Sequence, residues 1–142
     1  MRNLISWILP VLVLTSAVFS GCGTGTETAE EPDYAVPVVE SALQSISSGD
    51  YETYVDFFNE ESQSQLTEAV FRQAHQLITG KIGSYVSKTF EKVKVENGYK
   101  VVYYKAEFTD EPDIVTVRAV FDEEGDRMKL AGFWLDSPRL RK

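Results

Sequence analysis

Apolar residues recur every three or four positions through the first part of the region 34–138, a spacing typical of amphipathic helices. The first predicted helix covers residues 36–46 and ends at the run Ser47-Ser48-Gly49. A second helix is predicted after Asp50, because its carboxylate can accept hydrogen bonds from the free amides of a first helical turn. This second helix is expected to end near Asn59.

A third helix is predicted after Thr67, which can cap it, with Glu68 favoured in its first turn. It should end just before Gly80, because glycine fits just past the last turn of a helix. The polar segment 60–66 that precedes it is either a short turn of helix or a loop.

The pattern then changes to alternation of apolar and polar residues, which predicts β-strands. Four strands are expected, over residues 85–95, 99–108, 114–121 and 128–135. Asn97-Gly98 predicts a two-residue hairpin, because both central positions of that turn need positive φ. Further turns are expected at 110–113 and 123–126. Three helices followed by a four-stranded antiparallel meander define an α+β domain.

The start of the chain is apolar in a different way. Arg2 precedes a mostly apolar stretch at residues 4–19, and Ser20-Gly21 then leads to Cys22, the single cysteine. This is the layout of a secretion signal. An uncleaved membrane anchor is the alternative, but the stretch is shorter than the ~20 residues that span a bilayer as a helix.

The run Phe19-Ser20-Gly21-Cys22 resembles the end of a bacterial lipoprotein signal, although Phe19 stands where an aliphatic residue is usual. The resemblance implies that residues 1–21 are a signal peptide and that Cys22 carries fatty acyl chains such as palmitate. Two or three chains give a stable membrane anchor. The protein is therefore expected outside the cytoplasm, on the cell membrane or, since Gly23 is not an aspartate, on the outer membrane of a cell that has one.

Charge is distributed unevenly along the chain, whose formal net charge is −8. Residues 22–33 are expected to form a flexible acidic tether, and residues 34–142 the domain. No Lys or Arg lies between Arg2 and Arg72, so nucleic acid is a poor partner. The acidic balance should also keep the domain off an anionic lipid surface, leaving the anchor as the membrane contact. The same charge equally serves general solubility.

One stretch of the domain carries a family resemblance. Ile46-Ser47-Ser48-Gly49-Asp50-Tyr51-Glu52, followed by Tyr54 and Phe57-Phe58, resembles the start of nuclear-transport-factor-2-like domains, also called cystatin-like cone folds. Gly132-Phe133-Trp134 resembles their last long strands, and the likeness covers roughly residues 34–136. It implies a curved sheet wrapped around a helix, with a cleft in which relatives bind small molecules or act as enzymes. Many secreted lipoproteins with such a domain have no assigned activity.

Residues with polar tips are candidates for lining that cleft: Tyr54, His75, Tyr104, Arg118 and Trp134. His75, the only histidine, is the natural general base at neutral pH, but spacing identifies no nucleophile or orienting carboxylate beside it. A half-buried packing role fits it better. The tyrosines and Trp134 fit equally as core or rim aromatics. Arg118 needs a partner, either a neighbouring-strand carboxylate such as Glu107 or an anionic ligand.

No metal or cofactor is expected. One histidine and a lipidated cysteine cannot make a zinc site, and the acidic turns do not match a calcium loop. No nucleotide-binding loop or nucleophile elbow is present, and no catalytic residue is assigned.

We therefore expect a lipid-anchored extracytoplasmic module that binds a small molecule in the cleft or an envelope protein over the outer face of the sheet. The alternative is a small cone-fold enzyme, of the isomerase or hydrolase type, that uses His75 or an acidic base in the cleft. A homodimer formed through the sheet is a third option. A pocket with converging polar groups would favour the enzyme. A cleft plugged by apolar side chains, beside an exposed patch on the sheet, would favour the interaction role.

Overall fold

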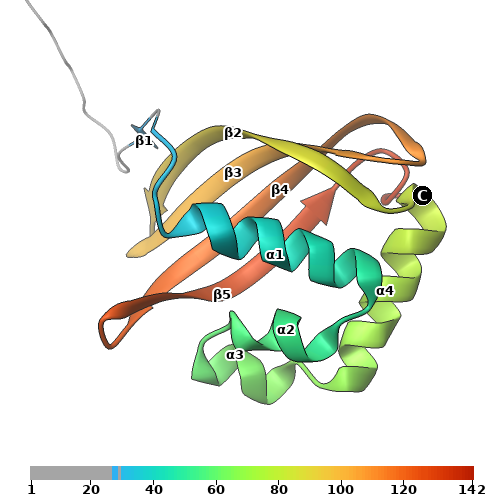
Figure 1. Cartoon of the computed structure of the whole chain (residues 1–142). Helices are drawn as coiled ribbons and strands as arrows, with labels where there is room; N and C mark the ends of the chain where they lie inside the picture. Colours follow the sequence, from blue (N-terminus) through green and yellow to red (C-terminus); the bar gives the residue numbers. More distant parts are fainter. Residues whose placement is uncertain (1–26, 29) are drawn as a thin grey trace, which may run out of the picture.

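The computed structural model describes residues 27–28 and 30–142. It is an α+β domain in which four helices pack against a curved antiparallel sheet (Figure 1). The fold class predicted from the sequence is confirmed, with one helix more than expected. In the part of the chain that is described, no helix is long and apolar enough to cross a membrane. Cys22 and the predicted signal at residues 1–21 lie outside the described residues.

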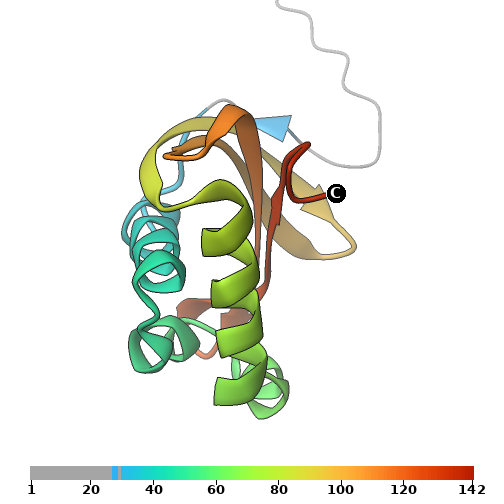
Figure 2. The same ribbon diagram turned by 90° about the vertical axis from the view of Figure 1, so that its right-hand side faces the viewer.

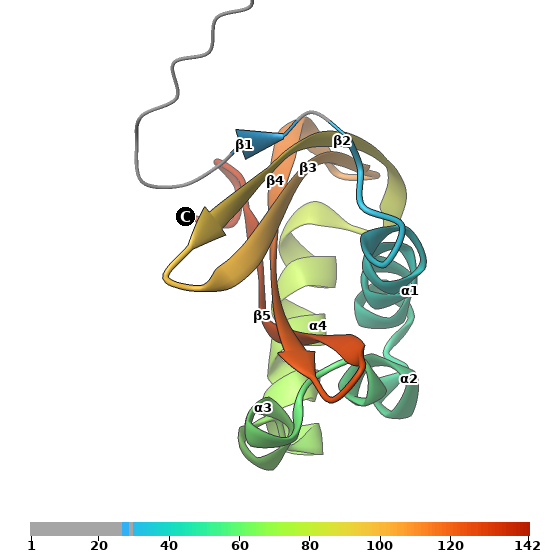
Figure 3. The ribbon, with the colours of Figure 1, turned by 90° about the vertical axis from the view of Figure 1, so that its left-hand side faces the viewer.

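The first helix, α1 (Ala35–Ser48), crosses the concave side of the sheet (Figure 3). Its apolar stripe is buried, with Val39 and Leu43 fully inaccessible. It ends where predicted, because Gly49 takes φ +84° and its N–H donates to the carbonyl of Ser45 at 2.9 Å. Asp50 then caps α2 (Tyr51–Asp56), as predicted, by accepting a hydrogen bond from the N–H of Thr53 at 3.2 Å.

The second helix ends at Asp56, earlier than the expected Asn59, because the following backbone pairs with the sheet. The N–H of Asn59 donates to the carbonyl of Leu130, and the N–H of Leu130 donates to the carbonyl of Phe57, both at 2.8 Å. The side chain of Asn59 then caps a separate helix, α3 (Glu60–Gln65), through the N–H of Ser62. The segment left open between helix and loop is thus a helix, which makes four rather than three.

The last helix, α4 (Glu68–Ile82), stands beside one end of the sheet (Figure 2). Thr67 caps it as predicted, accepting from the N–H of Val70 at 3.2 Å. The predicted end before Gly80 is wrong, because Gly80 lies within the helix and the helix ends at Gly83. Gly83 has φ +82°, and a Cβ there would overlap the hydroxyl of Thr109. That position therefore requires glycine, whereas Gly80 has open space beside it.

Four long strands form the antiparallel meander in sequence order: β2 (Tyr85–Glu96), β3 (Tyr99–Phe108), β4 (Glu111–Glu124) and β5 (Arg127–Asp136). The predicted hairpin is confirmed, with Asn97 at φ +53° and Gly98 at φ +86°. Strand β4 is longer at both ends than the predicted 114–121. Its flanking turns are therefore shorter than expected, so that Glu111 and Glu124 belong to the strand.

A two-residue strand, β1 (Glu27–Thr28), pairs with the outer edge of β2 (Figure 3). Its partners are Lys94 and Val93. Further along, the carboxylate of Glu31 accepts a hydrogen bond from the hydroxyl of Tyr104 at 2.7 Å. The expected tether at residues 22–33 is described only in part, and the described part contacts the domain.

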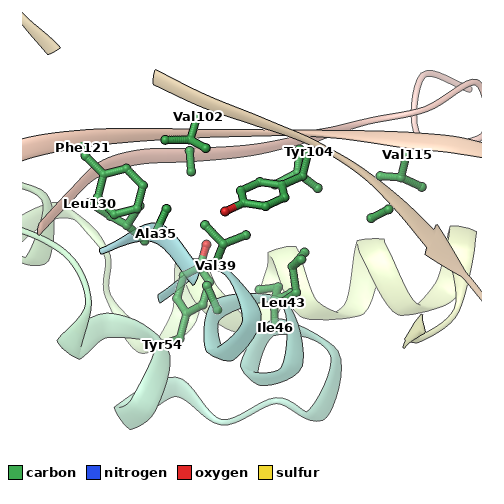
Figure 4. Close-up of a cluster of buried hydrophobic side chains, with 14 of the residues drawn as sticks. Ala35, Val39, Leu43, Ile46, Tyr54, Val102, Tyr104, Val115, Phe121 and Leu130 are labelled. Atoms are coloured by element: carbon green, nitrogen blue, oxygen red, sulfur yellow. The ribbon is translucent and has the colours of Figure 1, made fainter. Parts of the chain in front are cut away.

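The core lies between α1 and the concave, inner face of the sheet (Figure 4). The alternation read from the sequence is confirmed, because the residues that face α1 are all buried: Val102, Tyr104, Ala106, Phe108, Val115, Val117, Ala119 and Phe121. The opposite side, here called the outer face, is not covered by any helix in Figure 3.

Candidate functional site

The space between α1 and the inner face is filled by side chains. Val39 and Leu43 of α1 approach Tyr104, Val115 and Phe121 of the sheet, and all five are fully buried (Figure 4). Three aromatic rings, those of Tyr54, Phe58 and Phe71, close the lower end, with centroids 5.0 Å apart in the pairs Tyr54–Phe58 and Tyr54–Phe71. The region where a cone fold would hold a ligand is packed as a hydrophobic core.

Tyr104, one of the predicted cleft residues, is part of a polar network at the edge of this core. Its hydroxyl donates to Glu31, and Lys88 Nζ lies 3.7 Å from the same carboxylate and 4.7 Å from the centre of the Tyr104 ring. Lys88 also lies 3.8 Å from Glu40, which accepts a hydrogen bond from the hydroxyl of Tyr85 at 2.7 Å. Burial, followed by the hydrogen bond to Glu31, raises the pKa of Tyr104. Its hydroxyl is therefore a neutral donor that fastens residue 31 to the sheet.

Tyr54, the second predicted tyrosine, points into the core (Figure 4) and is 7% exposed. Its hydroxyl has no hydrogen-bond partner among the described residues, and burial raises its pKa. A shallow pocket of about 210 Å³ lies beside Tyr54. It is lined by Tyr54, Phe58, Ser62, Gln65, Leu66, Ala131 and Phe133. No carboxylate, lysine or histidine lines that pocket, so it offers no acid or base to Tyr54.

His75 joins α4 to the end of α1. Its Nδ1 lies 2.7 Å from the carbonyl of Ile46, which can only accept, so Nδ1 carries the proton. The ring is parallel to that of Phe71, with centroids 6.4 Å apart, and Nε2 faces Gly49. The His75 side chain has no hydrogen bond to a carboxylate or hydroxyl within the described part of the chain. This environment is that of a packing residue between two helices.

Arg118 and Trp134, the other two predicted residues, lie on the outer face and contact each other. They are directly opposite in the β4–β5 pairing, and Arg118 Cζ lies 4.9 Å from the centre of the Trp134 ring. In the next pairings Tyr103 is opposite Arg118, and Lys92 is opposite Tyr103 with its Nζ 5.2 Å from the ring centre. Lys92, Tyr103, Arg118 and Trp134 therefore form a line of alternating cations and aromatic rings across four strands, here called the outer-face row.

Glu96 fixes the middle of the outer-face row. One of its carboxylate oxygens accepts a hydrogen bond from the hydroxyl of Tyr103 at 2.8 Å, and the other lies 3.8 Å from Arg118 Nη2. The predicted carboxylate partner of Arg118 was Glu107, which instead accepts from the hydroxyl of Ser87 at 3.0 Å. The guanidinium is thus held by Glu96 on one side and the indole on the other, which restricts its rotamers.

Trp134 lies flat on the outer face because residue 132 has no side chain. A Cβ at Gly132 would overlap the indole ring of Trp134, two positions along the same strand. The ring nevertheless remains 52% exposed. A large, rigid aromatic surface is therefore presented outward at one end of the outer-face row.

Of the five predicted residues, the structure brings together only Arg118 and Trp134. Sequence reasoning grouped Tyr103 with Arg118 and Trp134 as polar-tipped residues but did not find Lys92 and Glu96 as their neighbours. The pairing of Lys92 with Tyr103 continues the register of the Asn97-Gly98 hairpin, and a β-bulge lies just beyond it, where the register shifts between Phe90 and Lys92. Phe90 and Lys92 would share a face in a regular strand, whereas the bulge places Phe90 beside buried Tyr104 and Lys92 beside Tyr103.

No three side chains of the metal-binding types gather closely enough to hold a metal ion within residues 27–28 and 30–142. The chain matches no curated protein and no solved structure. One family model does match, over residues 39–133, a range from the middle of α1 to β5. The chain therefore belongs to the family described as protein of unknown function (DUF3887).

Proposed function

We propose that this protein is a lipid-anchored extracytoplasmic interaction module, that its anchor is Cys22, and that its binding surface is the outer face of the sheet. One observation carries the proposal: the inner side of the sheet is filled by core side chains, while the outer-face row presents an exposed Trp134 and the half-buried Lys92, Tyr103 and Arg118, held by contacts with one another. The anchor is supported by the sequence pattern at residues 1–22.

The chemistry of the outer-face row supports binding rather than catalysis. Trp, Tyr and Arg are the residue types that contribute most to binding energy at interfaces. Here they are held on strands and by one another, so little conformational entropy remains to be lost on binding. Ile114 adds a further apolar side chain on the same face, 48% exposed.

The fold is proposed to be the nuclear-transport-factor-2-like cone. Support comes from the order of elements, helices first and then a curved four-stranded meander, and from α1 lying in the concavity (Figure 1). In this chain the concavity is plugged by large side chains of α1, α2 and α4.

An enzymatic role would need an acid or base beside a pocket. His75 donates from Nδ1 to the carbonyl of Ile46 and its Nε2 faces Gly49, while the hydroxyl of Tyr104 donates to Glu31. Neither is placed to exchange a proton with a ligand. The interaction role is therefore the function that the geometry favours.

Hydroxyl-radical footprinting of the protein in its native envelope tests the proposal. Trp134 should be oxidised several times more slowly in the envelope than in purified, detergent-free protein, because a partner covers it. Leu77 on α4, which is exposed by the same 52%, is the matched control and should react equally in both. Mass spectrometry of the same sample should find a diacylated Cys22 as the first residue. Equal reactivity of Trp134 in both samples, or an unmodified Cys22, would contradict the proposal.

A further inference from the structure

We infer that the outer face of the sheet binds the anionic headgroup surface of the membrane that holds the protein. The inference rests on the proposed function, because it requires the anchor at Cys22 and names the partner of the same surface. It follows from where the chain enters the domain, from the charges on the outer face and from its aromatic residues.

The entry point lies close to the outer-face row. Strand β1 begins at Glu27, only five residues after Cys22 (27 − 22 = 5), and Glu27 pairs with Lys94 of β2. Five residues span at most roughly 18 Å when fully extended. A small domain is about 30 Å across. The distance between the domain and the membrane is therefore smaller than the diameter of the domain. One side of the domain must remain close to the lipid surface.

The outer face is the basic side of an acidic chain. Lys92 and Arg118 belong to the outer-face row, and the neighbouring rows add Lys94, opposite Val101, and Lys105, opposite Thr116. Three carboxylates on this face have partners within the protein: Glu96 contacts Tyr103 and Arg118, Glu107 contacts Ser87, and Asp136 contacts Arg141.

The helical side has the opposite charge. Residues 35–65, which contain α1, α2 and α3, include six acidic residues and no Lys or Arg. At physiological ionic strength the Debye length is about 8 Å, so a membrane acts mainly on the charges that face it. The net charge of −8, from which repulsion was expected, is therefore not the charge that the lipid surface meets. Attraction to the outer face and repulsion of the helices favour a single orientation.

The aromatic residues of the outer-face row match the same surface. Trp and Tyr are enriched at the level of lipid headgroups, where the ring is partly buried and its polar group remains hydrated. Trp134 and Tyr103 present such rings beside Arg118 and Lys92, whose charged ends can reach phosphates. A headgroup layer offers both an apolar boundary and anionic charge, which together complement this face.

Trp134 provides a direct test. The chain has two tryptophans, Trp7 and Trp134, and removal of residues 1–21 leaves Trp134 as the single reporter. The mature lipoprotein is reconstituted into vesicles of phosphatidylcholine, with or without about 30% phosphatidylglycerol as the anionic lipid. The anchor holds the protein on both kinds of vesicle, so only its orientation differs. Emission of Trp134 and its quenching by acrylamide and by headgroup spin labels are then measured.

On anionic vesicles we expect a blue shift of Trp134 emission, quenching by the spin label and about twofold weaker quenching by acrylamide. About 1 M salt, at which the Debye length is near 3 Å, should reverse these changes. The double variant Lys92→Gln/Lys105→Gln should lose most of the shift. The control Arg72→Gln/Lys81→Gln removes the same charge from helix α4, outside the sheet, and should keep the shift.

Identical Trp134 spectra on anionic and neutral vesicles would overturn the inference, as would equal effects of the two double variants. Footprinting in the native envelope separates this failure from that of the proposed function. If Trp134 is protected in the envelope but insensitive to anionic lipid, the partner is a protein or another envelope polymer, and the proposed function stands. If Trp134 is unprotected in both settings, both proposals fail.

Discussion

The two tyrosine hydroxyls of the core differ in a way that has consequences for stability. Tyr104 donates to the carboxylate of Glu31 at 2.7 Å, whereas Tyr54 has no hydrogen-bond partner within the described residues. A buried hydroxyl without a partner costs free energy, because the water that it lost on folding is not replaced. The same chemical group is therefore stabilising at one position and unfavourable at the other.

The pair Tyr104→Phe and Tyr54→Phe tests this difference. Tyr104→Phe should lower the free energy of unfolding by about 1–2 kcal/mol, since it removes a hydrogen bond to a charged group. Tyr54→Phe should leave the free energy of unfolding unchanged or raise it slightly. Urea denaturation of both variants and the wild type measures these values. A loss at Tyr54 as large as that at Tyr104 would mean that an ordered water satisfies the Tyr54 hydroxyl.

Individual residues also set the limit of what the sequence could predict about the site. The need of Arg118 for a partner followed from its place among apolar neighbours, but the choice between Glu96 and Glu107 did not. Glu96 is near Arg118 because its carboxylate accepts a hydrogen bond from Tyr103, which lies directly opposite Arg118. The pairing of Lys92 with Tyr103 follows from the register of the two-residue hairpin, whereas the pairing of Tyr103 with Arg118 depends on where β3 ends and β4 begins, which alternation alone does not determine.

At the scale of elements, the end of α4 shows how two nearby glycines can have opposite roles. Gly80 lies in the helix with open space beside it, while Gly83 ends the helix at φ +82° against Thr109. Helical spacing could not separate them, because either position could follow the last apolar residue of the stripe. The contact that decides is with the β3–β4 turn, which lies far away in the sequence.

Alanine at these two positions should therefore act in opposite directions. Gly80→Ala should raise the free energy of unfolding by roughly 0.5–1 kcal/mol, because alanine restricts the unfolded chain and favours the helix. Gly83→Ala should lower it by more than about 1 kcal/mol, because alanine disfavours positive φ and its Cβ would displace Thr109. Thermal unfolding followed by circular dichroism distinguishes the two signs. Stabilisation by Gly83→Ala would show that the helix can end elsewhere.

The extra helix α3 has a related explanation. Its sequence, Glu60 to Gln65, has no apolar stripe, so periodicity could not distinguish helix from loop. Its position is set by contacts with distant residues: the hydroxyl of Ser62 donates to the carbonyl of Ala131, and the amide of Gln63 donates to the carbonyls of Val55 and Phe58. Such elements depend on the finished fold and are the least accessible to sequence reasoning.

At the scale of the whole molecule, one carboxylate fastens the C-terminal segment to the sheet. Glu111, at the start of β4, is buried and accepts hydrogen bonds from the N–H of Asp113 at 3.1 Å and of Arg139 at 3.0 Å. Burial alone would raise the pKa of Glu111. The hydrogen bonds from Ser137 and from the two backbone amides outweigh burial and hold the pKa below its ordinary value of 4.5.

Acid should therefore release this end of the chain. A lowered folded-state pKa contributes stability that is present above pH 4.5 and is lost as the pH falls through the folded-state value. We expect the difference in free energy of unfolding between the wild type and Glu111→Gln to shrink with acidification below that pH. Urea denaturation across pH 6 to pH 3 measures it, with Glu107→Gln as the exposed control. A constant difference over this range would exclude Glu111 as the titrating group.

The whole fold was more predictable than the site, because different information determines each. The α+β class and the inner residues of β3 and β4 follow from periodicity, which the core imposes on long segments. The contacts of Glu31 with Tyr104 and Lys88 come from a segment without large apolar residues, where no pattern exists to be recognised. The outer-face row depends on strand register, which alternation constrains only to one of two faces.

The pairing of β1 with β2 has a mechanical consequence. Within the described residues, two residue pairs join β1 to the sheet, at Glu27 and Thr28, and a load carried by an anchor at Cys22 would reach the domain through them. This short ladder should yield before α1 is stressed. Detachment of the chain up to Glu31 would lengthen the connection between the anchor and the folded domain by roughly 3.5 Å per residue. Under force, β1 would thus detach and extend first, while the core of the domain stays folded.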